Sequence, residues 1–165
     1  MDYSATTPCD RRVAQKMIPW LTEDFGNPAS KTHQWGWKAE AAIEHARAQV
    51  ADLIGADPKE IIWTSGATES NNLAIKGIAL ANPRGKHIVS ARTEHSSVLE
   101  SLSYLQTHHG FEITYLESDS LGNISLTDFS QAIRDDTTLV TLMTSNNETG
   151  CIHPIKTLAE YCQMR

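Results

Sequence analysis

The sequence predicts an α/β fold in three layers, a mainly parallel sheet with helices on both faces. Three observations support this prediction. Short apolar, β-branched runs alternate with longer helical patterns from residue 61 onward. Turn-forming residues separate these segments. The strand–helix order repeats four times, and this order is typical of parallel sheets that are covered by helices on both faces.

Residues 1–60 are predicted to form a helical segment that precedes the alternating segment 61–165. Asp10 is suited to cap the first helix, and Gly55 to end the second, because glycine readily adopts the left-handed backbone conformation. The loop FGNPAS separates these two helices. The apolar positions are Val13, Met17 and Leu21 in the first helix and Ile43, Ala46, Val50, Leu53 and Ile54 in the second.

The alternating segment contains four predicted strands, each followed by a helix. The strands are expected at 61–64, 87–91, 111–116 and 139–144, and the helices from Thr68, Ser97, Ser125 and Pro154. Ser97 with Glu100, and Ser125 with Asp128, have the spacing of capping pairs. Gly110 is expected to end the helix that starts at Ser97, and Cys162 to be a small core residue of the last helix.

Composition excludes several classes of function. Of the 165 residues, 40% are hydrophobic and 21% are charged, which is typical of a globular protein. The net charge of −6 argues against a nucleic-acid surface. No apolar run is long enough for a membrane span, and no signal-peptide pattern is present. Three widely spaced cysteines suit a reducing compartment, so a cytoplasmic protein is expected; the histidine and cysteine spacing predicts no metal site.

The stretch IIWTSGATESNN, residues 61–72, is the strongest local signal for a ligand. A strand, a small-residue turn and a helix start present free N–H groups, which favour an anion such as phosphate. Gly66 lets the backbone approach the anion, and Thr68 adds a hydroxyl donor. The alternative is a helix capped by Thr68 with Glu69 in its first turn, which requires no ligand.

Polar residues also follow two other predicted strands. Arg92 to His95 follow the strand 87–91, and Ser145 to Glu148 follow the strand 139–144. Ligands of such sheets bind at the carboxyl ends of the strands, so a phosphate site, an imidazole and a carboxamide are expected to share one pocket. This set suits a flat, phosphorylated aromatic cofactor. The alternatives are that His95 is satisfied by its own helix start and that Asn147 only forms a turn.

The sequence resembles the cysteine desulfurases, pyridoxal-phosphate enzymes of the class V aminotransferase group, and most of all the branch that supplies sulfur for iron–sulfur clusters and nitrogenase. The matching strings, which occur in family order, are DYSATTP, FGNPAS, GADPKEI, TSGATESNNLAIKG, TEHSSVLES and NNETG. The resemblance covers essentially the whole chain.

This resemblance implies a role for each matching position. Ala67 and Thr68 would hold the phosphate of pyridoxal 5'-phosphate, and His95 would stack on its ring and move protons. Asn147 would hydrogen-bond near the ring oxygen and the substrate. The whole enzyme would remove sulfur from L-cysteine, which leaves alanine and a persulfide on an enzyme cysteine, for delivery to a sulfur acceptor or scaffold protein. A homodimer is implied for the full-length enzyme.

The family features that perform the covalent steps are absent from these 165 residues. They are the Schiff-base lysine, the aspartate that pairs with the pyridine nitrogen, and the sulfur-accepting cysteine. The chain is therefore expected to be an amino-terminal fragment of the large domain, residues 1–165, and to be inactive alone. Two alternatives are another class V enzyme such as a selenocysteine lyase, and a non-catalytic binding domain. The reading frame beyond Arg165 would separate the last of these from an enzyme.

Overall fold

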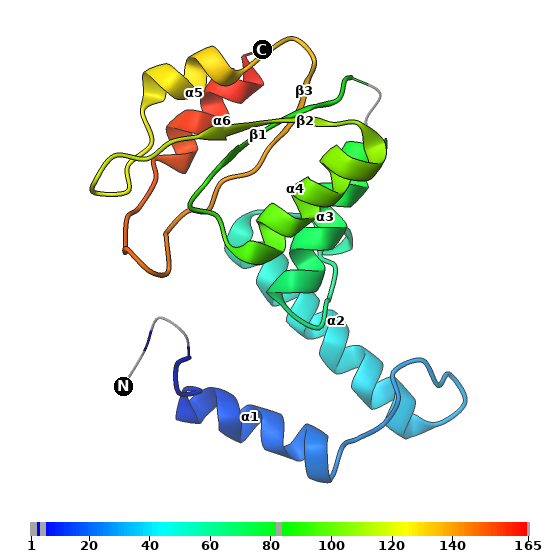
Figure 1. Ribbon diagram of the computed structural model, residues 1–165. Coiled ribbons are helices and arrows are strands. Elements are labelled where there is room, and N and C mark those ends of the chain that lie inside the picture. Colours follow the sequence, from blue (N-terminus) through cyan, green and yellow to red (C-terminus); the bar gives the residue numbers. More distant parts are fainter. Residues whose placement is uncertain (1–2, 4–5, 82–83, 165) are drawn as a thin grey trace. The chain divides into compact units, whose positions relative to one another are not determined.

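The computed structural model describes residue 3, residues 6–81 and residues 84–164. The chain divides into two compact units, Met1–Trp63 and Thr64–Arg165 (Figure 1). The first unit contains the helices α1 (Arg11–Thr22) and α2 (Gln34–Ile54) and the short 3-10 helix η1 (Pro58–Glu60).

The ends of the helices in the first unit follow the sequence rules. Asp10 caps α1, because its carboxylate accepts the N–H of Arg12 at 2.8 Å. Gly55 ends α2 in the left-handed conformation, with φ of 69°. Both predictions are confirmed. Within the described chain α1 buries none of its side chains, so the predicted apolar face of Val13, Met17 and Leu21 is exposed.

In the described part of the second unit, three parallel strands form a sheet and four helices accompany it. In chain order these are α3 (Ala67–Ala81), β1 (His87–Ala91), α4 (Ser96–His109), β2 (Glu112–Leu116), α5 (Leu126–Ala132), β3 (Thr137–Val140) and α6 (Ile155–Gln163). The strand order is β2-β1-β3, with β1 in the centre. All five residues of β1 are buried, as expected for a central strand with helices on both sides.

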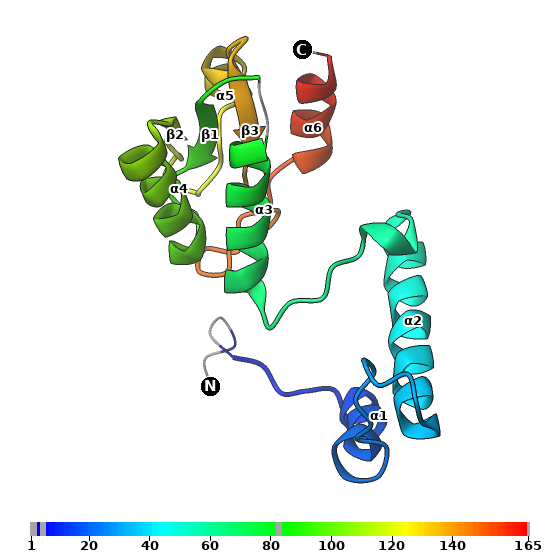
Figure 2. The same ribbon diagram turned by 90° about the vertical axis from the view of Figure 1, so that its right-hand side faces the viewer.

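Two apolar clusters form the core, one on each face of the sheet. Ile88 of β1 packs with residues of α3 and α4, such as Ile75 and Leu102. Val89, on the opposite face of the same strand, packs with Phe129 of α5 and Leu158 of α6. This is the predicted three-layer arrangement, and Figure 2 shows the sheet between the two pairs of helices. Cys162 is half-buried and packs against the second cluster, so its predicted place in the core is confirmed in part.

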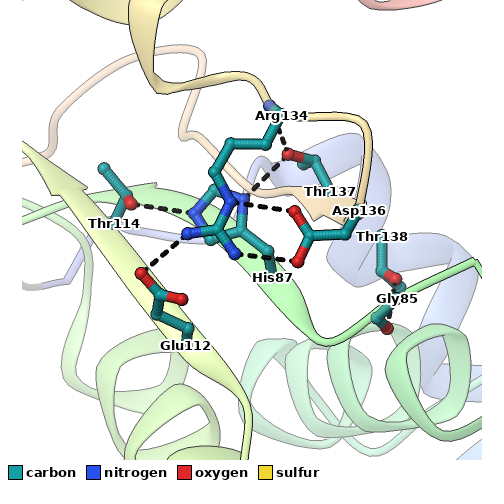
Figure 3. A network of polar contacts seen from close by, with 8 residues as sticks. All are labelled: Gly85, His87, Glu112, Thr114, Arg134, Asp136, Thr137 and Thr138. Atoms are coloured by element: carbon teal, nitrogen blue, oxygen red, sulfur yellow. Dashed lines mark hydrogen bonds and ion pairs between the residues drawn. The ribbon is translucent and has the colours of Figure 1, made fainter.

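A network of polar side chains ties the amino ends of the three strands together (Figure 3). The ring of His87, 0% exposed, has Nδ1 at 2.8 Å from the hydroxyl of Thr137 and Nε2 at 2.8 Å from that of Thr114. The Thr137 hydroxyl also accepts the backbone N–H of Arg134 at 2.8 Å. The other members are Gly85, Glu112, Asp136 and Thr138. We refer to these eight residues as the amino-end network.

Arg134 and Gly85 complete the amino-end network. The guanidinium of Arg134 binds Glu112 at 2.7 Å and Asp136 at 2.8 Å. Gly85 accepts the hydroxyl of Thr138 through its carbonyl at 2.7 Å. A side chain at Gly85 would place its Cβ 2.3 Å from the carbonyl oxygen of Asp136, so only glycine fits there.

Of the four predicted strands, one is wrong and another is wrong in its bounds. Residues 61–64 form no strand, and no described strand pairs with them. The Ile61 carbonyl is bound by the Arg47 guanidinium, and the next two side chains, Ile62 and Trp63, are 67% and 48% exposed. The predicted strand 139–144 is shorter and starts earlier, at Thr137–Val140, and its register with β1 ends where Val140 lies opposite Val89.

Two capping predictions differ in outcome. Ser125 caps α5 by accepting the N–H of Asp128 at 3.2 Å, as predicted. The Ser97–Glu100 pair does not cap α4: the helix begins at Ser96, and His95 is its N-cap. The imidazole of His95 takes the acceptor role that the sequence rules give to a hydroxyl. Gly110 ends this helix with φ of 67°, as predicted.

Candidate functional site

The first part of the candidate site is the turn that leads into α3. The carboxylate of Glu69 folds back and accepts the N–H of Ser65 at 2.7 Å and its hydroxyl at 2.6 Å. The hydroxyl, and then the N–H, hold the pKa of Glu69 below its ordinary value. Thr68 is the second residue of α3 and does not cap it, so the predicted cap is wrong, whereas Glu69 lies in the first turn of the helix as that alternative held.

The start of α3 has unused donors. The first backbone N–H with a helical hydrogen bond is that of Ser70, which donates to the Gly66 carbonyl at 3.1 Å. The N–H groups of Ala67, Thr68 and Glu69 meet no acceptor within the described chain. A Cβ added to Gly66 would touch nothing within 4 Å, so the space beside Gly66 is open. Such donors at a helix start suit a phosphate.

The second part is His95, which lies between the end of β1 and α4. Its Nδ1 accepts the N–H of Ser97 at 3.1 Å and lies 2.9 Å from the Ser97 hydroxyl. The alternative reading, a histidine satisfied at its own helix start, therefore holds for Nδ1. No hydrogen bond to Nε2 occurs among residues 3, 6–81 and 84–164, and the side chain is exposed. One nitrogen thus remains available to a ligand.

The third part is the loop after β3, where two neighbouring asparagines differ. Asn146 is 6% exposed; its amide donates to the Thr93 carbonyl at 3.0 Å, and its Oδ1 accepts the N–H groups of Glu148 and Thr149 at 2.9 Å. Asn147 is exposed and lies in the turn that Asn146 shapes. Its carboxamide forms no hydrogen bond with another described residue. Asn147 is a turn residue, as the alternative held, and its amide is free to bind.

Side-chain hydrogen bonds tie these three parts together. Asn71 of α3 donates to the hydroxyl of Ser97 in α4 at 2.8 Å, and Ser97 contacts His95. The N–H of Met143, just after β3, donates to the Glu94 carboxylate at 2.6 Å. Burial raises the pKa of Glu94, although the Met143 N–H and His95 oppose that shift. The start of α3, the end of β1 and the end of β3 are therefore neighbours, although residues 61–64 lie outside the sheet.

Sequence reasoning missed the residues that make these connections, namely Asn71, Glu94, Ser97 and Asn146. One signal was present: Asn71 follows Thr68 by three positions, so both lie on one face of α3. The partners of Asn71 and Asn146 are 26 and 53 residues away in sequence, and local patterns do not identify them.

The residues present fit a flat, phosphorylated cofactor better than a metal. Unpaired N–H groups, one imidazole edge and one free carboxamide make a neutral donor set. Within the described ranges, no three His, Cys, Asp or Glu side chains are grouped to hold a metal ion. No helix of the described chain has the length and apolarity to cross a membrane. A cavity of about 390 Å³ lies elsewhere, along the free side of β3 beside α6, and none of the predicted site residues lines it.

Comparison with known proteins identifies the family of this chain. The model of the aminotransferase class-V family matches residues 1–165. The cysteine desulfurase IscS of Dechloromonas aromatica (strain RCB) is 56% identical over 165 residues, which are 99% of this chain and 40% of that protein. The chain therefore spans about two fifths of the length of this relative.

Solved structures give the same result. A NifS-like protein superimposes with a TM-score of 0.92 at 38% identity, over 99% of this chain and 44% of the other. A structure described as SspA in complex with cysteine has a TM-score of 0.90 at 40% identity, over 99% of this chain and 47% of the other. The three-layer fold of the second unit is thus part of a larger known fold.

Proposed function

Because the chain belongs to the aminotransferase class V family, we propose that the protein is a cysteine desulfurase and that this chain holds its cofactor. Cysteine desulfurases of this family use pyridoxal 5'-phosphate, and a matched structure is described with bound cysteine. The observation that carries the proposal is the set of unpaired donors beside His95 and Asn147. The proposal includes residues 1–165 as part of one cofactor-binding large domain.

Each residue has a proposed task. The N–H groups of Ala67 and Thr68, with the Thr68 hydroxyl, bind the cofactor phosphate, because a helix start favours negative charge. His95 stacks on the pyridine ring, and Asn147 donates its free amide near the ring oxygen and the substrate. The chemistry that pyridoxal phosphate supplies when bound is an electron sink for the amino-acid substrate.

The remaining residues orient this set. Asn146 and Glu94 fasten the loop after β3 to the loop after β1, so Asn147 keeps a fixed place relative to His95. Preorganised donors of this kind stabilise charge without reorganisation at the moment of reaction. The imidazole of His95 is the group of this set that is suited to give and take up protons.

The partners belong to the same proposal. The substrate is L-cysteine, and the sulfur passes to an acceptor or scaffold protein in the cytoplasm. A homodimer is proposed for the full-length enzyme, and the exposed apolar side chains of α1, among them Met17 and Leu21, support an interface there. Sedimentation analysis of the full-length protein tests the dimer.

The experiment that tests the proposal is an assay of the full-length protein with pyridoxal phosphate, L-cysteine and a reductant. Alanine and sulfide are expected in equal amounts. Thr68→Ala should weaken cofactor binding about 10- to 150-fold, since it removes a charge-assisted hydrogen bond of roughly 1.5–3 kcal/mol. His95→Ala should change the absorption of the bound cofactor and slow turnover.

Other outcomes separate the alternatives. A strong preference for L-selenocysteine over L-cysteine would indicate a selenocysteine lyase. Cofactor binding without alanine formation would indicate a non-catalytic domain. Unchanged cofactor affinity in Thr68→Ala would reject the phosphate assignment.

A further inference from the structure

One ring nitrogen of His95, Nδ1, is held by hydrogen bonds that run through Ser97 to Asn71. Asn71 Nδ2 lies 2.8 Å from Ser97 Oγ, and Ser97 Oγ lies 2.9 Å from His95 Nδ1. The backbone N–H of Ser97 reaches the same Nδ1 at 3.1 Å. Ser97 is only 7% exposed, so water competes little for its hydroxyl. We refer to these three residues as the Asn71–Ser97–His95 relay.

The donors in this relay fix the direction of each proton. A backbone N–H and a carboxamide NH₂ can only donate. Because Nδ1 accepts the Ser97 N–H, it carries no proton. Because the Ser97 hydroxyl accepts from Asn71, its single proton points to Nδ1 as well. Two donors therefore converge on the Nδ1 lone pair, and the proton of the neutral ring lies on Nε2.

We infer that Asn71 and Ser97 are positioning residues that set the tautomer of His95, with the proton on Nε2. This inference rests on the proposed function, in which His95 lies against the cofactor. It adds that resting His95 meets its ligand as an N–H donor at Nε2, the nitrogen that no described residue binds. A ligand atom that faces this nitrogen is then an acceptor, such as an oxygen or an anionic sulfur.

The relay also limits when His95 acts as a base. The neutral ring can take up a proton only at Nδ1, where two donors already point. Uptake requires the Ser97 hydroxyl to rotate away and the hydrogen bond from the Ser97 N–H to Nδ1 to break. A hydrogen bond to one ring nitrogen commonly decides which nitrogen of a functional histidine carries the proton.

The test is the tautomer itself, read by ¹⁵N NMR of the histidine rings in the full-length protein without cofactor or substrate. His95→Gln assigns the signal by its loss. The wild type is expected to show a protonated Nε2 and an unprotonated Nδ1. Asn71→Asp, which is nearly isosteric, turns a donor into an acceptor and draws the Ser97 proton away. The ratio of the Nδ1–H to the Nε2–H form should then rise roughly fivefold or more, as expected for one hydrogen bond.

Asn72→Asp is the matched control. It adds the same charge one residue along α3, but the Asn72 amide donates to the Thr68 carbonyl at 2.9 Å and not to Ser97. The His95 signal should be unchanged in this variant. Equal spectra for Asn71→Asp and Asn72→Asp would overturn the inference, and so would a proton on Nδ1 in the wild type.

A second pair of variants covers the case in which Asn71→Asp does not fold. Ser97→Ala removes one of the two donors and leaves the backbone N–H alone at Nδ1, so the share of the Nδ1–H form should rise while the Nε2–H form still prevails. Ser97→Thr keeps the hydroxyl and should restore the wild-type signal. No difference between these two variants would also overturn the inference.

The readout separates this inference from the proposed function. The spectrum is recorded without ligand, so a relay-dependent tautomer supports the inference even if no alanine forms in the assay. If alanine forms but the Asn71 and Ser97 variants show the same tautomer as the wild type, the inference is rejected and the proposed function stands.

Discussion

The two ends of the three-stranded sheet use their polar residues in opposite ways. In the amino-end network, both ring nitrogens of His87 and the hydroxyl of Thr137 are bonded to neighbouring protein groups. At the carboxyl ends, the Ala67 and Thr68 N–H groups and the Nε2 of His95 meet no partner among the described residues. The polar groups at the amino ends are thus paired with one another, whereas those at the carboxyl ends are open to a ligand.

This difference shows how to tell a structural cluster from a binding site. Both ends hold a histidine near threonines, so residue types alone do not separate them. A buried polar group must be paired, because an unpaired one costs about 1–3 kcal/mol. An exposed polar group can stay unpaired at little cost and remains available to a ligand. We therefore expect changes at the amino ends to alter stability and changes at the carboxyl ends to alter binding.

The largest effect is expected for His87→Ala. The variant leaves a cavity in the core, and the Thr114 and Thr137 hydroxyls lose a hydrogen-bond partner. The free energy of unfolding should therefore fall by about 2–4 kcal/mol. Urea unfolding measures it. His95→Ala, the matched change at the other end, removes one exposed cap and should cost about 1 kcal/mol or less. Equal losses of unfolding free energy at both positions would contradict the proposed difference between the two ends of the sheet.

Thr137→Val should have the next largest effect. Valine keeps the shape of threonine but removes the hydroxyl that serves both His87 and the Arg134 N–H. A loss of about 1–3 kcal/mol is expected, because two buried or half-buried groups lose a partner. An unchanged free energy of unfolding would mean that water replaces the hydroxyl, and the amino-end network would then not be paired within the protein alone.

A smaller effect is expected from pH. Burial first, and then the Arg134 guanidinium, lower the pKa of His87, while Asp136 and Glu112 oppose the shift. The unfolded chain therefore binds the proton more readily, so this contribution to stability is complete above the ordinary pKa of about 6.5 and falls as pH falls below it. The difference in unfolding free energy between wild type and His87→Gln should shrink below about pH 6.5. A difference that stays constant from pH 7 to 5 would contradict the assigned pKa shift.

The sequence predicted the layers of this fold well, because periodic burial is a local property. It failed at residues 61–64, which have the composition of a strand, because a strand also needs a neighbour to pair with. It also misplaced the cap of α4, because an imidazole acceptor at His95 is not among the usual capping residues.

For the candidate site, sequence indicated where polar groups gather but not how they connect. Thr68, His95 and Asn147 follow from their positions after apolar runs and from family strings. The bond between Asn71 and Ser97 depends on how α3 and α4 pack, and that packing is a tertiary property. The same holds for His87, whose partners are 27 and 50 residues away. The roles proposed for the site residues stay predictions until binding is measured.

The smallest effect on stability is expected for Thr68→Val, the same substitution as at Thr137. The Thr68 hydroxyl is exposed and bonds no described residue, so the free energy of unfolding should change by no more than about 0.5 kcal/mol. Affinity for pyridoxal phosphate, followed by absorbance in the full-length protein, should instead fall about 10- to 150-fold. Thr68→Ser keeps the hydroxyl and should bind as the wild type does. A Thr68→Val variant that loses more than about 1 kcal/mol of stability would place Thr68 in a paired network like that of Thr137, and the open character of the carboxyl ends would be wrong.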